Sequence, residues 1–167
     1  MRLKLPALAV LLSLAGLLPF IACALFAVSV HEPIGTIWLR ALIFYGALIL
    51  SFLGGVHWGL ALAEWRIDPA CGLDGTEHHR VRFGLGVVPS LIGWAALLST
   101  LLLSPEVALA ILIAGFIETV LGEARLKGGE LLPSGYLWLR WALTVVVVVV
   151  LVTVLVLRLS GVLVVPS

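Results

Sequence analysis

The sequence predicts an all-α polytopic membrane protein, a five-transmembrane-helix bundle formed by one integral membrane domain over residues 1–167. Of its residues, 62% are hydrophobic and 11% are charged, whereas roughly a quarter of the residues in soluble domains are charged. The apolar residues fall into five runs, each near the ~20 residues that cross about 30 Å of hydrocarbon. A soluble globular protein is therefore excluded. The predicted spans are residues 5–30, 36–64, 83–103, 105–123 and 136–157.

The first span follows two basic residues, Arg2 and Lys4, and could instead be a signal peptide. A signal peptide has an apolar region of about 7–15 residues, whereas this apolar run extends from Leu5 to Val30. We therefore expect an uncleaved transmembrane helix. Pro19 lacks a backbone N–H donor and is expected to kink this helix.

The second span contains the most informative stretch of the chain. Ser51, Gly55 and Gly59 recur every four residues, which forms a small-residue stripe that lets another helix backbone approach closely. His57 lies two residues from Gly55, about 200° round the helix, on a face that also holds Gly54. Because both faces suit packing against neighbours, we predict that the second span is the central helix.

The remaining spans are joined by turn-forming segments. Pro89 is expected to bend the third span, and the indole of Trp94 is expected to point inward to a partner. Ser104 can cap the fourth span, whose first residue is proline. The unbroken valine run at 145–150 predicts that the fifth span is a peripheral, lipid-facing helix.

The basic residues are distributed asymmetrically between the two sides of the predicted membrane. With the N-terminus inside, eight of the ten lie on the inner side, and only Arg40 and Arg158 lie on the outer side. Basic residues are enriched in cytoplasmic loops. We therefore expect the N-terminus inside and the C-terminus outside, in a bacterial inner (plasma) membrane or an equivalent bilayer.

His57 and Glu118 are the two ionisable residues that the predicted spans place well inside the apolar layer. Such residues are costly there and are functional candidates by default. Both fall in the inner half of the bilayer at similar height, and Glu118 shares its face with Gly115 and Gly122. We therefore predict a hydrogen bond between His57 and Glu118, with close helix packing around both.

This pair leaves three interpretations open. It could be a structural contact worth about 0.6–2 kcal/mol, or a proton or ion relay, because histidine titrates near neutral pH. It could also belong to a cofactor site in which His57 ligates a haem and Trp58 and Trp94 line the pocket. The structural contact is favoured, because only one histidine lies within a span and no inverted repeat typical of transporters is evident.

Several stretches resemble a known family. The phrase YGALILSFLGGVHWG at 45–59, with segments at 82–90, 115–118 and 132–140, is similar to domain-of-unknown-function family 3429, the transmembrane protein 69-like small membrane proteins. The resemblance extends over nearly the whole chain, from Leu5 to Leu157. It implies a small integral membrane protein and supplies no catalytic residues.

The sequence contains no GxSxG, HExxH or P-loop motif, so we expect a protein that is not an enzyme, without a cofactor or metal ion. Asp74, His78 and His79 would make at most a loose metal site on a loop. The favoured function is a non-enzymatic membrane factor that packs on or supports another membrane complex. Its partners would be the lipid bilayer and a membrane protein or a second copy, with no nucleic acid. The alternative is a small transporter or proton-linked channel that uses His57 and Glu118 and has a polar cavity at their level.

Overall fold

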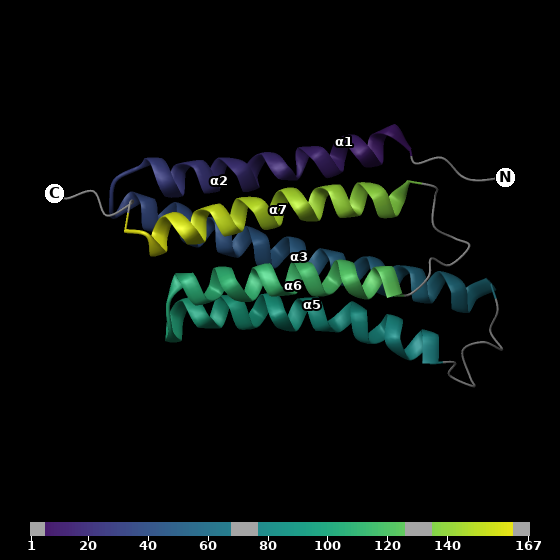
Figure 1. Cartoon of the computed structure of the whole chain (residues 1–167). Helices are drawn as coiled ribbons and strands as arrows, with labels where there is room; N and C mark the ends of the chain where they lie inside the picture. Colours follow the sequence, from purple (N-terminus) through teal and green to yellow (C-terminus); the bar gives the residue numbers. More distant parts are fainter. Residues whose placement is uncertain (1–5, 68–76, 126–134, 162–167) are drawn as a thin grey trace.

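The structure is a computed structural model that describes residues 6–67, 77–125 and 135–161, and in these residues all regular secondary structure is helical. The helices lie side by side along one axis, and the start of α1 and the end of α7 lie at opposite ends of the bundle (Figure 1). The predicted all-α class is confirmed for these residues. The helices are α1 (Ala7–Ala15), α2 (Leu17–Ser29), α3 (Ile34–Ile67), α5 (Glu77–Leu102), α6 (Pro105–Arg125) and α7 (Tyr136–Leu159).

Four helical segments are long and apolar enough to cross a membrane, namely Ala7–Ser29, Ile34–Gly59, Pro105–Glu123 and Tyr136–Leu159. The apolar part of α5, Gly86–Leu102, is shorter. The described chain thus holds four or five candidate spans, and each coincides with one of the predicted runs.

The first span consists of α1 and α2, which are interrupted at Gly16. Pro19 lies in the first turn of α2, where its missing N–H is tolerated, but its ring clashes with a helical carbonyl four residues earlier. The interruption expected from Pro19 therefore occurs just before α2. The Tyr45 hydroxyl of α3 donates a 2.9 Å hydrogen bond to the Gly16 carbonyl oxygen, which satisfies a backbone acceptor at the interruption.

The helix α3 is central, as predicted, and packs against α2, α5 and α6. Its contact with α5 runs through small residues. A Cβ added to Gly93 would lie 3.0 Å from the Ala47 carbonyl oxygen, and a Cβ added to Gly54 would overlap the carbonyl of Gly86. The two contact points are seven residues apart on each helix, about two turns. We call these four residues the α3–α5 seam.

Gly55 and Gly59 lie outside this seam. Both are exposed, and no atom of the described residues comes within 4 Å of a Cβ built at either position. The expected close packing inside the chain therefore does not form there, because the contact with α5 uses the neighbouring face that carries Gly54. Ser51 is half-buried and donates to its own helix, at the Ala47 carbonyl oxygen 3.0 Å away.

On α6, a close contact does form at one of the two predicted glycines. A Cβ added to Gly115 would lie 2.7 Å from a methyl group of Ile92 and 2.8 Å from one of Leu50, so this glycine allows α3, α5 and α6 to meet. Gly122 is half-buried. The bundle interior is otherwise formed by large apolar side chains, including Phe20, Leu39, Leu42, Ile43, Leu50, Leu109, Leu112, Phe116 and Leu151.

The outer surface is also apolar. Leu101 and Phe52 are 81% and 72% exposed, and along α7 Val145 and Val149 are exposed while Val147 is buried. Water would disfavour such a surface, whereas hydrocarbon accepts it. The valine run therefore faces outward over part of its circumference, and its inner positions pack against the bundle.

An ionic group joins three helices at the C-terminal end of α7. The Arg158 Nη1 atom lies 3.0 Å from Glu32 Oε1, and its Nε atom lies 3.4 Å from Glu106 Oε1. The Thr36 hydroxyl donates a 2.6 Å hydrogen bond to Glu32. This bond, together with Arg158, lowers the pKa of Glu32. Carboxylates at helix starts and an arginine at a helix end also suit the helix dipoles.

Candidate functional site: a buried charged cluster beside an apolar cavity

Three ionisable side chains from three helices meet inside the opposite end of the bundle. His57 of α3 places Nε2 3.0 Å from Oε1 of Glu123 on α6. Arg140 of α7 donates from Nε to both Glu123 oxygens at 3.0 Å, and its Nη2 lies 2.8 Å from Oε1. The three side chains are only 6%, 4% and 10% exposed, in the order His57, Glu123, Arg140. We call these residues the charged cluster.

The contacts within the charged cluster are not equivalent. Only the Arg140 Nε bonds have hydrogen-bond geometry, whereas His57 Nε2 and Arg140 Nη2 approach Oε1 closely without being aligned with it. A buried donor without an aligned acceptor costs free energy. The two Nε bonds of Arg140 are therefore the directional contacts within the charged cluster.

Each member of the charged cluster continues the buried face of its helix. On α6, the buried residues Leu112 and Phe116 precede Glu123 by eleven and seven residues, spacings that return to the same side of a helix. On α7, buried Arg140 is followed by buried Thr144 and Val147 at the same kind of spacing. The inward faces of α6 and α7 therefore both end in a charged residue at the same end of the bundle.

Glu118, the predicted partner of His57, is exposed and does not lie at the charged cluster. It precedes Glu123 by five residues, about 140° round the helix, which turns it to the outer side of α6. The predicted bond between His57 and Glu118 is therefore wrong: His57 contacts Glu123. The sequence analysis did not single out Glu123, the last residue of the predicted fourth span, or Arg140. The spacing of apolar residues along α6 and α7 was the signal that could have identified both.

The charged cluster and the ionic group at Arg158 lie about one membrane thickness apart. Arg140 and Arg158 are separated by 18 residues on α7, about 27 Å at 1.5 Å per residue. Glu106 and Glu123 are separated by 17 residues on α6, about 26 Å. The hydrocarbon layer is about 30 Å thick. The charged cluster therefore lies near an edge of the apolar layer, and His57 lies closer to that edge than predicted.

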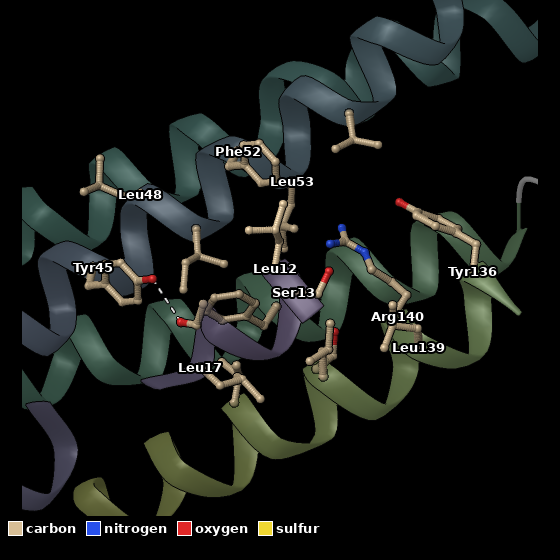
Figure 2. Close-up of a pocket in the computed structure, with 17 residues that line it drawn as sticks. Leu12, Ser13, Leu17, Tyr45, Leu48, Phe52, Leu53, Tyr136, Leu139 and Arg140 are labelled. Atoms are coloured by element: carbon tan, nitrogen blue, oxygen red, sulfur yellow. Dashed lines mark hydrogen bonds between the residues drawn. The ribbon is translucent and has the colours of Figure 1, made fainter. Parts of the chain in front are cut away.

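A cavity of about 440 Å³ lies between α1, α3 and α7, next to Arg140 (Figure 2). Its wall is mostly apolar, and Phe116 of α6 contributes to it. Arg140 and Tyr136 lie side by side at one end, and Tyr45 lies at the other end with its hydroxyl bonded to Gly16 (Figure 2). The cavity therefore has polar groups near its two ends and an apolar wall between them.

The aromatic residues that could have lined a pocket lie elsewhere. Trp94 is 62% exposed, so the expectation that its indole points inward is wrong. Trp58 is 44% exposed, and its ring packs edge-on against Phe83 with centroids 5.5 Å apart. A Cβ added to Gly86 would overlap the Trp58 indole, so Trp58 packs on the α5 side of α3 and does not line the cavity.

The loose metal site considered at Asp74, His78 and His79 falls on side chains outside those that the structure describes.

Comparison with known proteins places the chain in a family. The model of the family described as "Protein of unknown function (DUF3429)" matches residues 5–156. Over 90 residues, the chain is 39% identical to Transmembrane protein 69 of Xenopus tropicalis and 34% identical to Transmembrane protein 69 of Mus musculus. Each match covers 54% of this chain but only 32% and 33% of the respective relative, about a third of its length. No solved structure matches the chain. The chain belongs to the DUF3429 family.

Proposed function

We propose that the protein is a non-enzymatic membrane factor that packs against a helix of another membrane protein through the outward face of α3. The observation that carries this proposal is the exposure of two glycines one turn apart on the central helix. These glycines share one helical face with exposed large apolar residues. We call this face the α3 outer face; it consists of Leu48, Phe52, Gly55, Gly59 and Leu62.

Glycine on a face that touches only lipid brings no benefit. It costs about 1 kcal/mol relative to alanine in a helix interior. At Gly54, Gly86 and Gly93, an added Cβ would meet a neighbouring helix. Gly84 of α5 is exposed and, like Gly55 and Gly59, has no described atom within 4 Å of an added Cβ. Small residues at such positions let helix backbones approach closely in a membrane. Gly55 and Gly59 would in the same way allow a helix of a partner protein to approach the α3 outer face closely.

The rest of the bundle suits a fixed support for such a contact. The charged cluster connects α3 to α6 and α7 at one end, and the Arg158 group connects α7 to the start of α6 and to Glu32, just before α3, at the other. The α3–α5 seam fixes the remaining neighbour of α3. With these contacts in place, α3 presents its outer face in one orientation.

The transport alternative has less support. It was based on a pair between His57 and Glu118, whereas His57 contacts Glu123 near the edge of the apolar layer. An ion pathway needs polar groups along its length. The cavity beside Arg140 has a mostly apolar wall, and Arg140 is paired with Glu123. These observations favour a contact that stabilises the bundle over a conducting pathway.

We further propose an N-terminus-inside orientation in a bacterial inner membrane, from the distribution of basic residues.

Native mass spectrometry of the protein, extracted from its own membrane in mild detergent, tests this proposal. We expect a hetero-complex for the natural chain, and we expect Gly55→Leu to release the monomer, because the new side chain blocks close helix approach. The matched control is Ala110→Leu, which adds the same bulk at an exposed position on α6. A monomer for the natural chain, or a hetero-complex that survives both Gly55→Leu and Gly59→Leu, would contradict the proposal.

A further inference from the structure

We propose that the cavity between α1, α3 and α7 binds one acyl chain of a phospholipid, with the lipid phosphate at the Arg140 end. This inference does not rest on the contact proposed at Gly55 and Gly59, although the cavity shares Leu48 and Phe52 with the α3 outer face. Four features carry the inference: the length of the cavity, its opening, its wall and its polar end.

The cavity has the length of one leaflet. On α7 its lining extends from Tyr136 to Val147, and on α3 it extends from Tyr45 to Val56. Each range rises by about 16 Å along its helix, which is half of the roughly 30 Å hydrocarbon layer. Because Arg140 lies near the edge of that layer, the cavity reaches from the headgroup level to about the bilayer midplane. An acyl chain of that leaflet occupies the same depth.

The cavity opens toward the bilayer. Leu12 of α1 is 62% exposed, and Leu48 and Phe52 of α3 are 66% and 72% exposed. All three also line the cavity, so its mouth lies between α1 and α3 on the lipid-facing surface. A lipid chain can enter sideways through this opening without passing through the packed core.

The wall and the volume suit a hydrocarbon chain. Between the two ends, the lining is dominated by leucine, valine and phenylalanine side chains, with Ser13 and Thr144 as small polar exceptions. The Ser13 hydroxyl already donates to the Ala9 carbonyl oxygen at 2.8 Å. The volume of about 440 Å³ falls within the roughly 300–1,000 Å³ range of small-molecule sites. An apolar wall without a ligand loses dispersion contacts, which a chain would restore.

The polar end suits an anion. Arg140 lines the cavity and is nine-tenths buried. Its Nε donates to Glu123, whereas its Nη2, 2.8 Å from Glu123 Oε1, has no aligned acceptor. Tyr136 lies beside it and also lines the cavity (Figure 2). A phosphate group offers the oxygen acceptors that arginine favours. We therefore assign the headgroup end to Arg140 and Tyr136, and we assign the chain end to Tyr45.

Photocrosslinking of the full chain in nanodiscs tests this assignment. The probe is a phospholipid with a diazirine at the end of one acyl chain, and mass spectrometry locates the labelled residues. We expect labelling at the cavity residues near Tyr45 and Val147. Leu143→Trp, which adds bulk to the wall, is expected to reduce this labelling about tenfold, equivalent to about 1.4 kcal/mol. The matched control is Val149→Trp on the exposed side of α7, which is expected to leave cavity labelling unchanged.

Two further measurements make the result decisive. Ser13→Leu adds bulk from α1, so it gives an independent variant if Leu143→Trp does not fold, as judged by gel filtration and thermal unfolding. A diacylglycerol probe with the same diazirine chain lacks the phosphate and is expected to label the cavity about tenfold less. The proposal is overturned if labelling is spread over the outer surface and insensitive to both filling variants. It is also overturned if the two probes label the cavity equally.

Discussion

Three nitrogen atoms, Nε2 of His57 and Nε and Nη2 of Arg140, lie within 3.0 Å of the Glu123 carboxylate. Glu123 is 4% exposed, so its charge has almost no access to water. Replacing both members of a buried ion pair by apolar residues is often nearly neutral, whereas removing one member leaves an uncompensated buried charge. The contribution of each residue of the charged cluster to stability therefore depends strongly on whether the other two are present.

Arg140→Leu is expected to destabilise the protein by about 3–5 kcal/mol, because Glu123 would remain buried without its cation. The double variant Glu123→Leu/Arg140→Leu is expected to recover most of this loss. Unfolding in detergent micelles, monitored as the loss of helical signal, measures the stability of both variants. Glu118→Gln is the control and is expected to change stability by no more than about 0.5 kcal/mol, as an exposed residue. An effect of Arg140→Leu no larger than that of the control would contradict this account.

At the residue scale, the sequence identified one member of the charged cluster. His57 stands out because a histidine among glycines in an apolar run needs a polar partner. Glu118 lies deeper in its apolar run than Glu123, so depth alone points to the wrong partner for His57. Burial of a charge depends on the face it occupies. The buried positions Leu112, Phe116 and Glu123 share that face, whereas Glu118 does not.

Among the helices, the α3–α5 seam brings two backbones closest. Gly54→Ala is expected to destabilise the protein by about 1–3 kcal/mol, because its Cβ would overlap the Gly86 carbonyl, which a rotamer change cannot move. Gly55→Ala, one residue away with no described atom within 4 Å, is expected to be neutral or to gain up to about 1 kcal/mol of helix propensity. Thermal unfolding in detergent compares the two. Equal losses of thermal stability in the two variants would show that α3 meets α5 through a different face.

Helix positions were predictable to within a few residues, because long apolar runs bounded by Gly and Pro carry a strong signal. Two differences have local causes. The first span is interrupted at Gly16, just ahead of Pro19, where the proline ring conflicts with a helical carbonyl. Helix α5 begins at Glu77 instead of 83, because a helix can continue beyond the apolar layer and hydropathy marks only the membrane part. The packing face of α3 could not be chosen from sequence, since both faces carry glycine.

At the scale of the whole molecule, the two ionic groups mark the two edges of the apolar layer, and the distribution of basic residues predicts which edge is inside. In a variant without Cys23 and Cys71, we expect Ser160→Cys to react with a membrane-impermeant maleimide in intact cells. We expect Ser134→Cys to react only after the membrane is permeabilised. The opposite labelling pattern would reverse the proposed orientation while leaving the bundle itself unchanged.

The central claim is that His57 of α3 and Glu123 of α6 are coupled inside the bundle. A double-mutant cycle in detergent, with His57→Ala and Glu123→Gln made singly and together, measures this coupling directly. We predict an interaction energy of about 0.5–3 kcal/mol for this pair, and additivity within about 0.3–0.5 kcal/mol for His57→Ala with Glu118→Gln. Additivity for the His57/Glu123 pair, or coupling between His57 and Glu118 instead, would contradict the account.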